Sequence, residues 1–509
     1  MFSRITSIGL FGLESYRVDV EADLSGGLPR FDVVGLPDAA VSESRERVRA
    51  AIHNSGFDFP VSRVTINLAP ADIKKEGPVY DLPIMMALLK ATGQLRVNTD
   101  GCAFIGELSL SGEIHKINGV LPMVIRAQKE SIEKIFVPYD NRRESAVVKG
   151  IEVYPVKTVK ELLDHLNGIQ KIEPVTEDDY IEMLTPLGLP DFSDVKGQYQ
   201  PKRALEVAAA GGHNVLMIGP PGSGKSMLAK RIPSILPDMT FDESLETTNI
   251  YSISGKLPDG ISLIKARPFR SPHHTISPAG LSGGGTVPRP GEISLAHNGV
   301  LFLDELPEFS RSSMEILRQP IEDGKITIAR VAATYSYPCS VMLVAAMNPC
   351  PCGNFGHPTK PCTCPKGAPA RYLSKVSGPL LDRLDIHIEV PAVNYDELSS
   401  TVKEECSADI KKRVNAARKL QQQRLENTGI SCNAKMTAAL TRKHCQITEE
   451  ASKVLKTSFE SLGLSARAYD KVLRVSRTVA DLENDEIINS EHILEAVQYR
   501  SLDRKFWKT

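Results

Sequence analysis

Eight consecutive residues near the middle of the chain have the types and spacing of a phosphate-binding loop. Glycines in such a loop let backbone N–H groups turn toward phosphate oxygens at a helix N-terminus. Lys225 would reach the β- and γ-phosphates, and the Ser226 hydroxyl would ligate Mg²⁺. A glycine-rich turn could match by chance, but an apolar run precedes the loop and helical spacing follows it, so the stretch predicts binding of ATP with Mg²⁺. The loop, which fits G-x-x-x-x-G-K-[ST] throughout, consists of Gly219, Pro220, Pro221, Gly222, Ser223, Gly224, Lys225 and Ser226.

Two further apolar runs end in polar residues suited to ATP hydrolysis. Residues 300–303 lead into Asp304 and Glu305, and residues 341–347 lead into Asn348. Continuous apolar runs are typical of buried parallel strands, whose carboxyl ends hold the ligands of α/β proteins. Asp304 would hold Mg²⁺ through water, Glu305 would polarise the attacking water, and Asn348 would position that water or contact the γ-phosphate.

Four cysteines follow Asn348 in two close pairs. Four thiolates can close a tetrahedral Zn²⁺ site, although C-x-C spacing is tighter than the commoner C-x₂-C. His357 is a reserve ligand, and the alternative is four unligated thiols in a mobile loop. We predict a structural zinc site without a catalytic role, held by Cys350, Cys352, Cys362 and Cys364.

The whole chain has the composition of a soluble, multi-domain protein. It has 509 residues, 41% of them hydrophobic, with a net charge of −1, so no global field draws it to nucleic acid or acidic lipid. Arg4, Glu14 and Arg17 interrupt any signal-peptide core, and the apolar runs are too short to span a membrane. The odd count of nine cysteines favours a reducing compartment. We therefore expect a cytoplasmic protein.

Patterning predicts a multi-domain α/β protein. Residues 1–170 alternate as half-buried strands with amphipathic helices, and 171–190 has the composition of a linker. Residues 191–395 would form the ATPase core with a cysteine-rich insertion at 350–364, and 396–509 would be helical. Inside the core, the Pro/Gly/His-rich segment 267–285 predicts an exposed loop. Its Arg270, His273 and His274 suit a polyanion, although a solvated insertion is the alternative.

Residues 74–81 and 106–113 resemble the proteolytic domain of the Lon family, whose fold resembles domain 2 of ribosomal protein S5. In that family a serine follows the Gly-Pro pair, where this chain has Val79. The catalytic lysine would fall near Leu121, and residues 118–125 contain no lysine. A nucleophile and its base are both required for covalent catalysis, so we expect the fold without the protease.

Other segments resemble AAA+ ATPases. The resemblance places Val195 and Gln198, in a V-x-G-Q segment, beside the adenine, and gives Asn348 the sensor-1 role. Residues 377–385 resemble the arginine-finger segment of the MCM and magnesium-chelatase branch, so Arg383 would act on a neighbouring subunit. A surface pair of Asp382 with Arg383 is the alternative.

The same resemblance concerns the helical end of the chain and a hairpin in the core. Arg467 is the sensor-2 candidate at a helix start, with Arg474 and Arg477 as alternatives. A pre-sensor hairpin would carry Lys325 and Arg330 toward a central pore, where they could contact DNA.

The order of Lon-like domain, AAA+ core and helical lid resembles the magnesium-chelatase-like YifB/ComM family. Its most specific segments here are 269–275, 291–299 and 347–353. The resemblance implies a hexameric, ATP-driven DNA motor that promotes branch migration in recombination and natural transformation. Its partners would be DNA, further copies of the chain and recombination proteins, with no membrane. The alternative is a chelatase-type or chaperone-type ATPase that remodels a protein partner.

Overall fold

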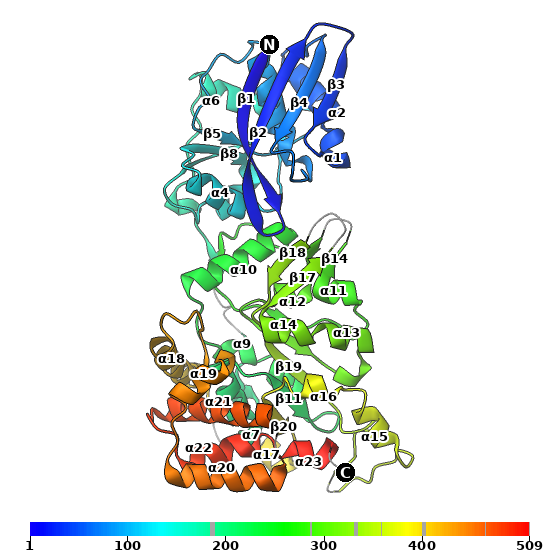
Figure 1. Cartoon of the computed structure of the whole chain (residues 1–509), viewed down its shortest axis with the longest axis vertical. Helices are drawn as coiled ribbons and strands as arrows, with labels where there is room; N and C mark the ends of the chain where they lie inside the picture. The colour runs from blue at the N-terminus through cyan, green and yellow to red at the C-terminus, as the bar shows by residue number, and fades with distance from the viewer. Residues whose placement is uncertain are drawn as a thin grey trace. The chain divides into compact units, whose positions relative to one another are not determined.

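The computed structural model describes residues 1–183, 189–285, 288–329, 334–357, 359–399, 404–463 and 465–507. The chain forms two compact units (Figure 1). The N-terminal unit comprises Met1–Leu184, Phe241–Ile264 and Ala329–Ser336, and the ATPase unit comprises the remainder. The ATPase core and the helical region therefore form one compact unit, and two core segments belong to the other.

The N-terminal unit is built on a seven-stranded mixed sheet with the order β3-β4-β2-β1-β5-β8-β9. The pairs β1–β2 and β2–β4 are antiparallel. The pairs β3–β4, β1–β5, β5–β8 and β8–β9 are parallel. Buried and partly exposed residues alternate along β4, as predicted for a sheet covered on one face. The strands are β1 (Phe2–Phe11), β2 (Glu14–Ser25), β3 (Arg30–Val34), β4 (Arg63–Ala69), β5 (Cys102–Phe104), β8 (Lys134–Pro138) and β9 (Glu152–Val156).

Helices of this unit pack against the sheet. Helix α3 is buried at ten of its eleven residues and contacts β1 and β2, which explains its nearly continuous apolar sequence. Val79, just before α3, and Leu121, on α4, are both buried. The helices are α1 (Ala39–Ser42), α2 (Ser44–Asn54), α3 (Asp81–Ala91), α4 (Val120–Lys129), α5 (Arg142–Ser145) and α6 (Val159–Leu166), and a short hairpin joins β6 (Glu107–Leu108) to β7 (Ile114–His115).

A segment that follows the phosphate loop in sequence belongs to the N-terminal unit. It contains α10 (Phe241–Ser254) and β12 (Leu263–Ile264), which pairs in parallel with β10 (Glu182–Met183). The Ser252 hydroxyl donates to the buried Glu144 carboxylate at 2.6 Å. Residues 171–183, expected to be part of a linker, are thus incorporated into this unit through β10.

The ATPase unit is built on a five-stranded parallel sheet with the order β13-β16-β19-β11-β20. On β11, Val215 and Met217 join one hydrophobic core while Leu216 and Ile218 join another. Both faces of the strand are therefore covered, which explains why its sequence is apolar throughout. The strands are β11 (Val215–Ile218), β13 (Phe269–Arg270), β16 (Val300–Leu303), β19 (Met342–Met347) and β20 (Ile386–Glu389).

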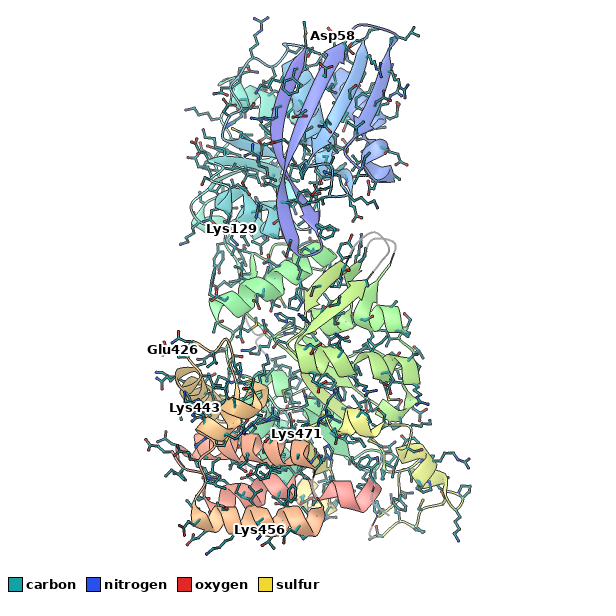
Figure 2. All side chains as sticks on the ribbon, in the orientation of Figure 1. Asp58, Lys129, Glu426, Lys443, Lys456 and Lys471 are labelled. Atoms are coloured by element: carbon teal, nitrogen blue, oxygen red, sulfur yellow. The ribbon has the colours of Figure 1, made fainter. Side chains whose placement is uncertain are left out.

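The C-terminal part of the ATPase unit is helical, as predicted, and contains no strand among its described residues (Figure 1, orange to red). Its helices α18 and α21 contact α7 (Tyr199–Gly211) of the core. Figure 2 labels Lys471 on α21; this lysine is buried and lies 2.9 Å from Asp385, whereas Lys443 and Lys456 are exposed. The lid helices are α18 (Ser407–Arg424), α19 (Ala438–His444), α20 (Glu449–Leu462), α21 (Ala466–Glu483), α22 (Ser490–Gln498) and α23 (Leu502–Trp507).

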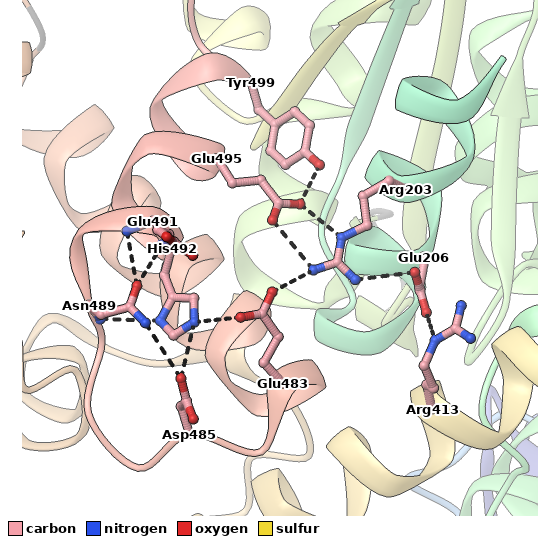
Figure 3. Close-up of polar contacts among 10 residues, drawn as sticks. All are labelled: Arg203, Glu206, Arg413, Glu483, Asp485, Asn489, Glu491, His492, Glu495 and Tyr499. Carbon is pink, nitrogen blue, oxygen red and sulfur yellow. Dashed lines mark hydrogen bonds and ion pairs between the residues drawn. The ribbon is translucent and has the colours of Figure 1, made fainter.

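A network of ion pairs joins α7 to three lid helices (Figure 3). Arg203 Nε lies 3.0 Å from Glu495 on α22, and its Nη2 lies 3.3 Å from Glu483 on α21. One turn along α7, Glu206 accepts from Arg413 of α18 at 2.5 Å. Because most of these side chains are partly exposed, each pair should add little stability to the contact between α7 and the lid helices. No described helix is long and apolar enough to cross a membrane.

Candidate nucleotide-binding site

The phosphate loop connects β11 to α8 (Lys225–Ala229), as the sequence predicts. Gly222 and Gly224 have φ angles of +76° and +93°, which side chains other than glycine rarely adopt. Lys225 Nζ donates to the carbonyls of Gly219 at 2.8 Å and Pro220 at 2.9 Å. Burial lowers the pKa of Lys225, and Asp304 partly offsets that effect.

The carboxyl ends of three neighbouring strands bring the predicted hydrolytic residues together. Ser226 Oγ donates to Asp304 Oδ2 at 2.6 Å, and Lys225 Nζ donates to Asn348 Oδ1 at 3.1 Å. A hydroxyl and a carboxylate side by side are the oxygen ligands that Mg²⁺ takes in nucleotide sites, so these residues fit the predicted ion. Glu305 has φ of +52° and an exposed side chain, which leaves its carboxylate accessible to a bound water.

The V-x-G-Q segment lies against the loop. Gln198 Nε2 donates to Ser223 O at 3.2 Å and Pro391 O at 2.7 Å. Among the described residues, Gln198 Oε1 and Ser223 Oγ are buried and have no hydrogen-bond partner, so both could bond to a polar ligand. Val195 is fully buried. Two unmatched polar atoms beside a phosphate loop fit a bound nucleotide.

A buried ion pair that sequence reasoning missed holds the same segment. Lys202 Nζ lies 2.7 Å from Glu404, and Glu404 also accepts from the Gly197 N–H at 3.1 Å. Glu404 lies in the helical region, 202 residues after its partner. No local pattern could have indicated this contact.

The segment expected to be an exposed polyanion-binding loop is exposed or partly exposed at all but two of its residues, but it also contains short elements of secondary structure, and its binding of a polyanion stays a prediction. It forms β13, α11 (Pro278–Ser282) and β14 (Gly283–Gly284). His274 Nδ1 lies 3.4 Å from Glu305 Oε2, which places this residue at the hydrolytic centre. Its ring contacts His273, with ring centroids 4.1 Å apart. His273 is exposed, and its Nδ1 lies 2.9 Å from the Thr275 hydroxyl.

The other residues predicted to contact DNA do not share one environment: one is bonded to a carboxylate, one is exposed on a hairpin and one is not described. Arg270 donates two hydrogen bonds to Glu292, at 2.6 and 2.8 Å, so its guanidinium is already engaged. Lys325 is exposed at the start of β17 (Lys325–Ala329), which pairs with β18 (Thr334–Pro338). Arg330 lies outside the described residues. The segment Ala329–Ser336 belongs to the N-terminal unit, where the ring of Tyr335 stacks on that of Phe11 with centroids 4.8 Å apart.

The proposed arginine finger makes contacts within its own chain. Arg383 Nε donates to Arg318 O at 2.8 Å, its Nη1 donates to Pro379 O at 2.7 Å, and its Nη2 pairs with Glu322. The side chain is 13% exposed. The structure therefore pairs Arg383 with Glu322 instead of Asp382. A role on a neighbouring subunit requires the guanidinium to exchange these contacts.

Among the three arginines weighed for the sensor-2 role, Arg467 alone is exposed. It lies in the first turn of α21, whose N-cap is Ser465. Arg474 donates to the carbonyls of Ala434 and Met436, while Arg477 is buried and pairs with Asp481 at 3.0 Å. Arg474 and Arg477 therefore have partners within the fold, and Arg467 remains the residue predicted to have the sensor-2 role.

The four cysteines predicted to hold zinc converge. Cys350 Sγ lies 3.4 Å from Cys352 Sγ and 3.7 Å from Cys362 Sγ, and all four sulfurs lie within 4.8 Å of one another. Sulfurs bound tetrahedrally to zinc are about 3.8 Å apart, given Zn–S bonds of about 2.3 Å, so the set fits the ion. The Asn354 backbone N–H lowers the pKa of Cys352 to about 5. His357 is not part of this group, because its Nδ1 accepts backbone N–H groups of Thr359 and Lys360.

A second cluster of potential ligands, Glu483, Asp485 and His492, is organised differently (Figure 3). His492 Nδ1 accepts the Asn489 N–H at 3.2 Å as part of a helix cap. The neutral ring therefore carries its proton on Nε2 and donates it to Glu483 at 2.9 Å. That nitrogen has no lone pair for a metal, so the cluster stabilises the start of α22.

Comparison with known proteins places this site within a family. Residues 191–398 match the family model for magnesium chelatase, subunit ChlI; residues 20–141 match subunit ChlI of Mg-chelatase, and residues 404–500 match its C-terminal model. The chain belongs to this magnesium-chelatase-like family of AAA+ proteins.

Within the family, the chain belongs to the YifB/ComM group. It is 44% identical over 498 residues to YifB of Escherichia coli, covering 97% of this chain and 96% of that protein. It is 41% identical over 502 residues to competence protein ComM of Haemophilus influenzae, covering 98% and 97% respectively. A shorter stretch of 137 residues is 29% identical to Lon protease 2 of Bacillus subtilis, covering 26% of this chain and 23% of that protein, in agreement with the Lon-like resemblance.

Proposed function

We propose that this protein is an ATP-hydrolysing ring motor that acts on DNA and drives branch migration in recombination and natural transformation. The observation that carries ATP hydrolysis is the convergence of the Ser226–Asp304 and Lys225–Asn348 pairs on one edge of the sheet. Support for DNA comes from the name of the relative ComM, a competence protein. The working form would be a cytoplasmic hexamer that meets recombination proteins on branched DNA.

In this proposal each residue of the site has one task. Backbone N–H groups of residues 219–226 and the Lys225 ammonium bind the phosphates, and Ser226 with Asp304 would hold Mg²⁺, which shields phosphate charge. Glu305 takes the proton of the attacking water, and Asn348 orients that water. Arg467 and, from a neighbouring copy, Arg383 would face the charge that develops on the phosphoryl group.

The test is ATP-dependent displacement of a labelled strand from a three-strand junction, with wild type and Glu305→Gln side by side. Displacement by wild type alone supports the proposal, because Glu305→Gln removes the base while it keeps the size of the side chain. ATP turnover without strand movement and without stimulation by DNA refutes the DNA motor.

The second candidate is an ATPase of the chelatase or chaperone type that remodels a protein partner. It is favoured by the bonding of Arg270 to Glu292, which leaves the predicted DNA-contact segment without that guanidinium. Under this alternative, ATP turnover responds to a protein partner and not to DNA. A pull-down with Glu305→Gln, which holds ATP without hydrolysing it, would reveal such a partner.

We also propose that the four-cysteine group holds one structural Zn²⁺. Thiolate ligands in all four positions leave no open position for a substrate. Metal analysis of the purified protein should find about one zinc per chain, and Cys352→Ser should lose it. A stable protein that contains no zinc would contradict this assignment.

A further inference from the structure

A cavity of 460 Å³ lies beside the hydrolytic residues within the ATPase unit. Glu305 and Asn348, which would handle the attacking water, line one part of it. The rest is lined by Glu308, Pro351 of the cysteine group, Lys375, and residues of α15 (Ala368–Leu373) that include Arg371 and Tyr372. The cavity therefore joins the catalytic edge of the sheet to the segment that follows the cysteines.

Some of the charged side chains that line this cavity have a charged or ionisable neighbour within the described part of the chain, and one does not. Lys375 pairs with Glu308 at 3.4 Å, and Glu305 has His274 as its neighbour at 3.4 Å. The Arg371 guanidinium makes no hydrogen bond or ion pair with any residue that the structure describes. An exposed arginine needs no partner, but this one lines the same cavity as the two residues that would flank the γ-phosphate.

The cysteine group lies between Asn348 and the helix that carries Arg371. Cys350 follows Asn348 by two residues, and Cys364 precedes the first residue of α15 by four. A tetrahedral metal site at the base of this loop would hold α15 in a fixed position relative to β19. Helix α15 also contacts α23, and the rings of Phe355 in the loop and Phe506 in α23 have centroids 6.5 Å apart. Arg371 is thus carried on a braced segment.

We propose that Arg371 binds the γ-phosphoryl group during hydrolysis, and the inorganic phosphate that results, from within its own chain. This inference rests on the proposed ATPase activity. In that reaction the water oxygen bonds to the γ-phosphorus, and the bond from that phosphorus to the β–γ bridging oxygen breaks. ADP leaves with the electron pair of the broken bond, and Glu305 takes the proton of the water. The Arg371 guanidinium offsets the charge on the equatorial oxygens throughout.

This assignment differs from the arginine roles that the sequence indicates. Arg383 is bonded to Glu322 and two carbonyls of its own chain, and Arg467 lies on the lid. Arg371 shares a cavity with Glu305 without any rearrangement. Its contribution should therefore be present in a single chain, whereas that of Arg383 requires a neighbouring copy.

The test compares wild type, Arg371→Ala and Arg371→Lys in steady-state ATP hydrolysis, with ADP affinity and trapping of ADP by aluminium fluoride measured on the same samples. We expect Arg371→Ala to lower kcat at least about tenfold, because removal of one charge-stabilising group at a transition state typically costs that much or more. ADP affinity should stay within about twofold, since the β-phosphate is held by the loop. Trapping should be lost in Arg371→Ala and partly restored in Arg371→Lys.

Arg96→Ala is the matched control, because Arg96 is an exposed arginine of the N-terminal unit whose guanidinium, among the residues that the structure describes, donates only to the Gly93 carbonyl. Zinc content should be equal in all variants, which excludes damage to the cysteine group. Wild-type kcat and trapping in Arg371→Ala would overturn the inference. A wild-type protein that does not hydrolyse ATP would instead refute the proposed function, so the two failures are distinguishable.

Discussion

The contact between the cysteine group and the phosphate loop makes a quantitative prediction for Gly353→Ala. Gly353 has φ of +81°, and a Cβ built on it would lie 2.2 Å from Pro221 Cδ and 2.7 Å from Pro221 Cγ. Carbon atoms in favourable contact are about 3.5–4.0 Å apart, so Pro221 must retreat by more than about 1 Å. Pro221 is part of the loop that binds the phosphates, and its ring cannot rotate away.

Two costs add in this variant. A non-glycine residue in the left-handed region costs about 1–2 kcal/mol, and displacement of the loop adds to that. If about 1.4 kcal/mol of the total falls on nucleotide binding, the Kd for ADP rises about tenfold. The assay is titration with a fluorescent ADP analogue, and zinc content should not change, since no ligand is altered.

Gly56→Ala is the control for backbone strain alone. Gly56 has φ of +84° in the N-terminal unit, and a Cβ there would meet nothing within 4 Å. We expect the cost of backbone strain in both variants, a further loss of stability from displacement of Pro221 in Gly353→Ala, and a loss of ADP affinity in Gly353→Ala alone. Equal ADP affinity in Gly353→Ala and wild type would refute the coupling between the cysteine group and the loop.

Three further predictions concern the ATPase unit. Lys471→Met leaves Asp385 buried without its 2.9 Å partner, which should cost about 3–5 kcal/mol in urea unfolding. Burial raises the pKa of Asp385, but Lys471 outweighs burial and holds that pKa below its usual value. The stabilisation from the pair is therefore complete above about pH 4 and declines as the pH falls further. Below about pH 4 the difference in unfolding free energy between wild type and Lys471→Met should shrink. His274→Ala removes the neighbour of Glu305 and should lower kcat about fivefold at unchanged KM, equivalent to about 1 kcal/mol, whereas His273→Ala should not.

Local sequence was sufficient for the elements that hold the nucleotide. The expected strands are β11, β16 and β19, and the cysteine pairs converge as their spacing indicated. These features depend on short-range rules: a covered parallel strand must be apolar throughout, and glycines must occupy positive φ at the loop. Such signals are complete within about ten residues, so a sequence can display them.

What the sequence could not show depends on contacts between distant segments. Composition predicted an exposed loop at 267–285, yet parallel pairing of β13 with β16 brings His274 to Glu305. Glu404 reaches Lys202 across 202 residues, and residues 241–264 join the N-terminal unit although they follow the phosphate loop.

The sequence by itself therefore indicated the class of protein, the phosphate loop, the residues predicted to hydrolyse ATP and the four cysteines. Only the tertiary structure decided which arginines have partners: Arg270 pairs with Glu292 and Arg383 with Glu322, whereas Arg371 lines the cavity beside Glu305. The physical reason is that a motif specifies the local backbone and the type of side chain. The partner of a long, flexible guanidinium is set by which acidic groups the folded chain brings within its reach.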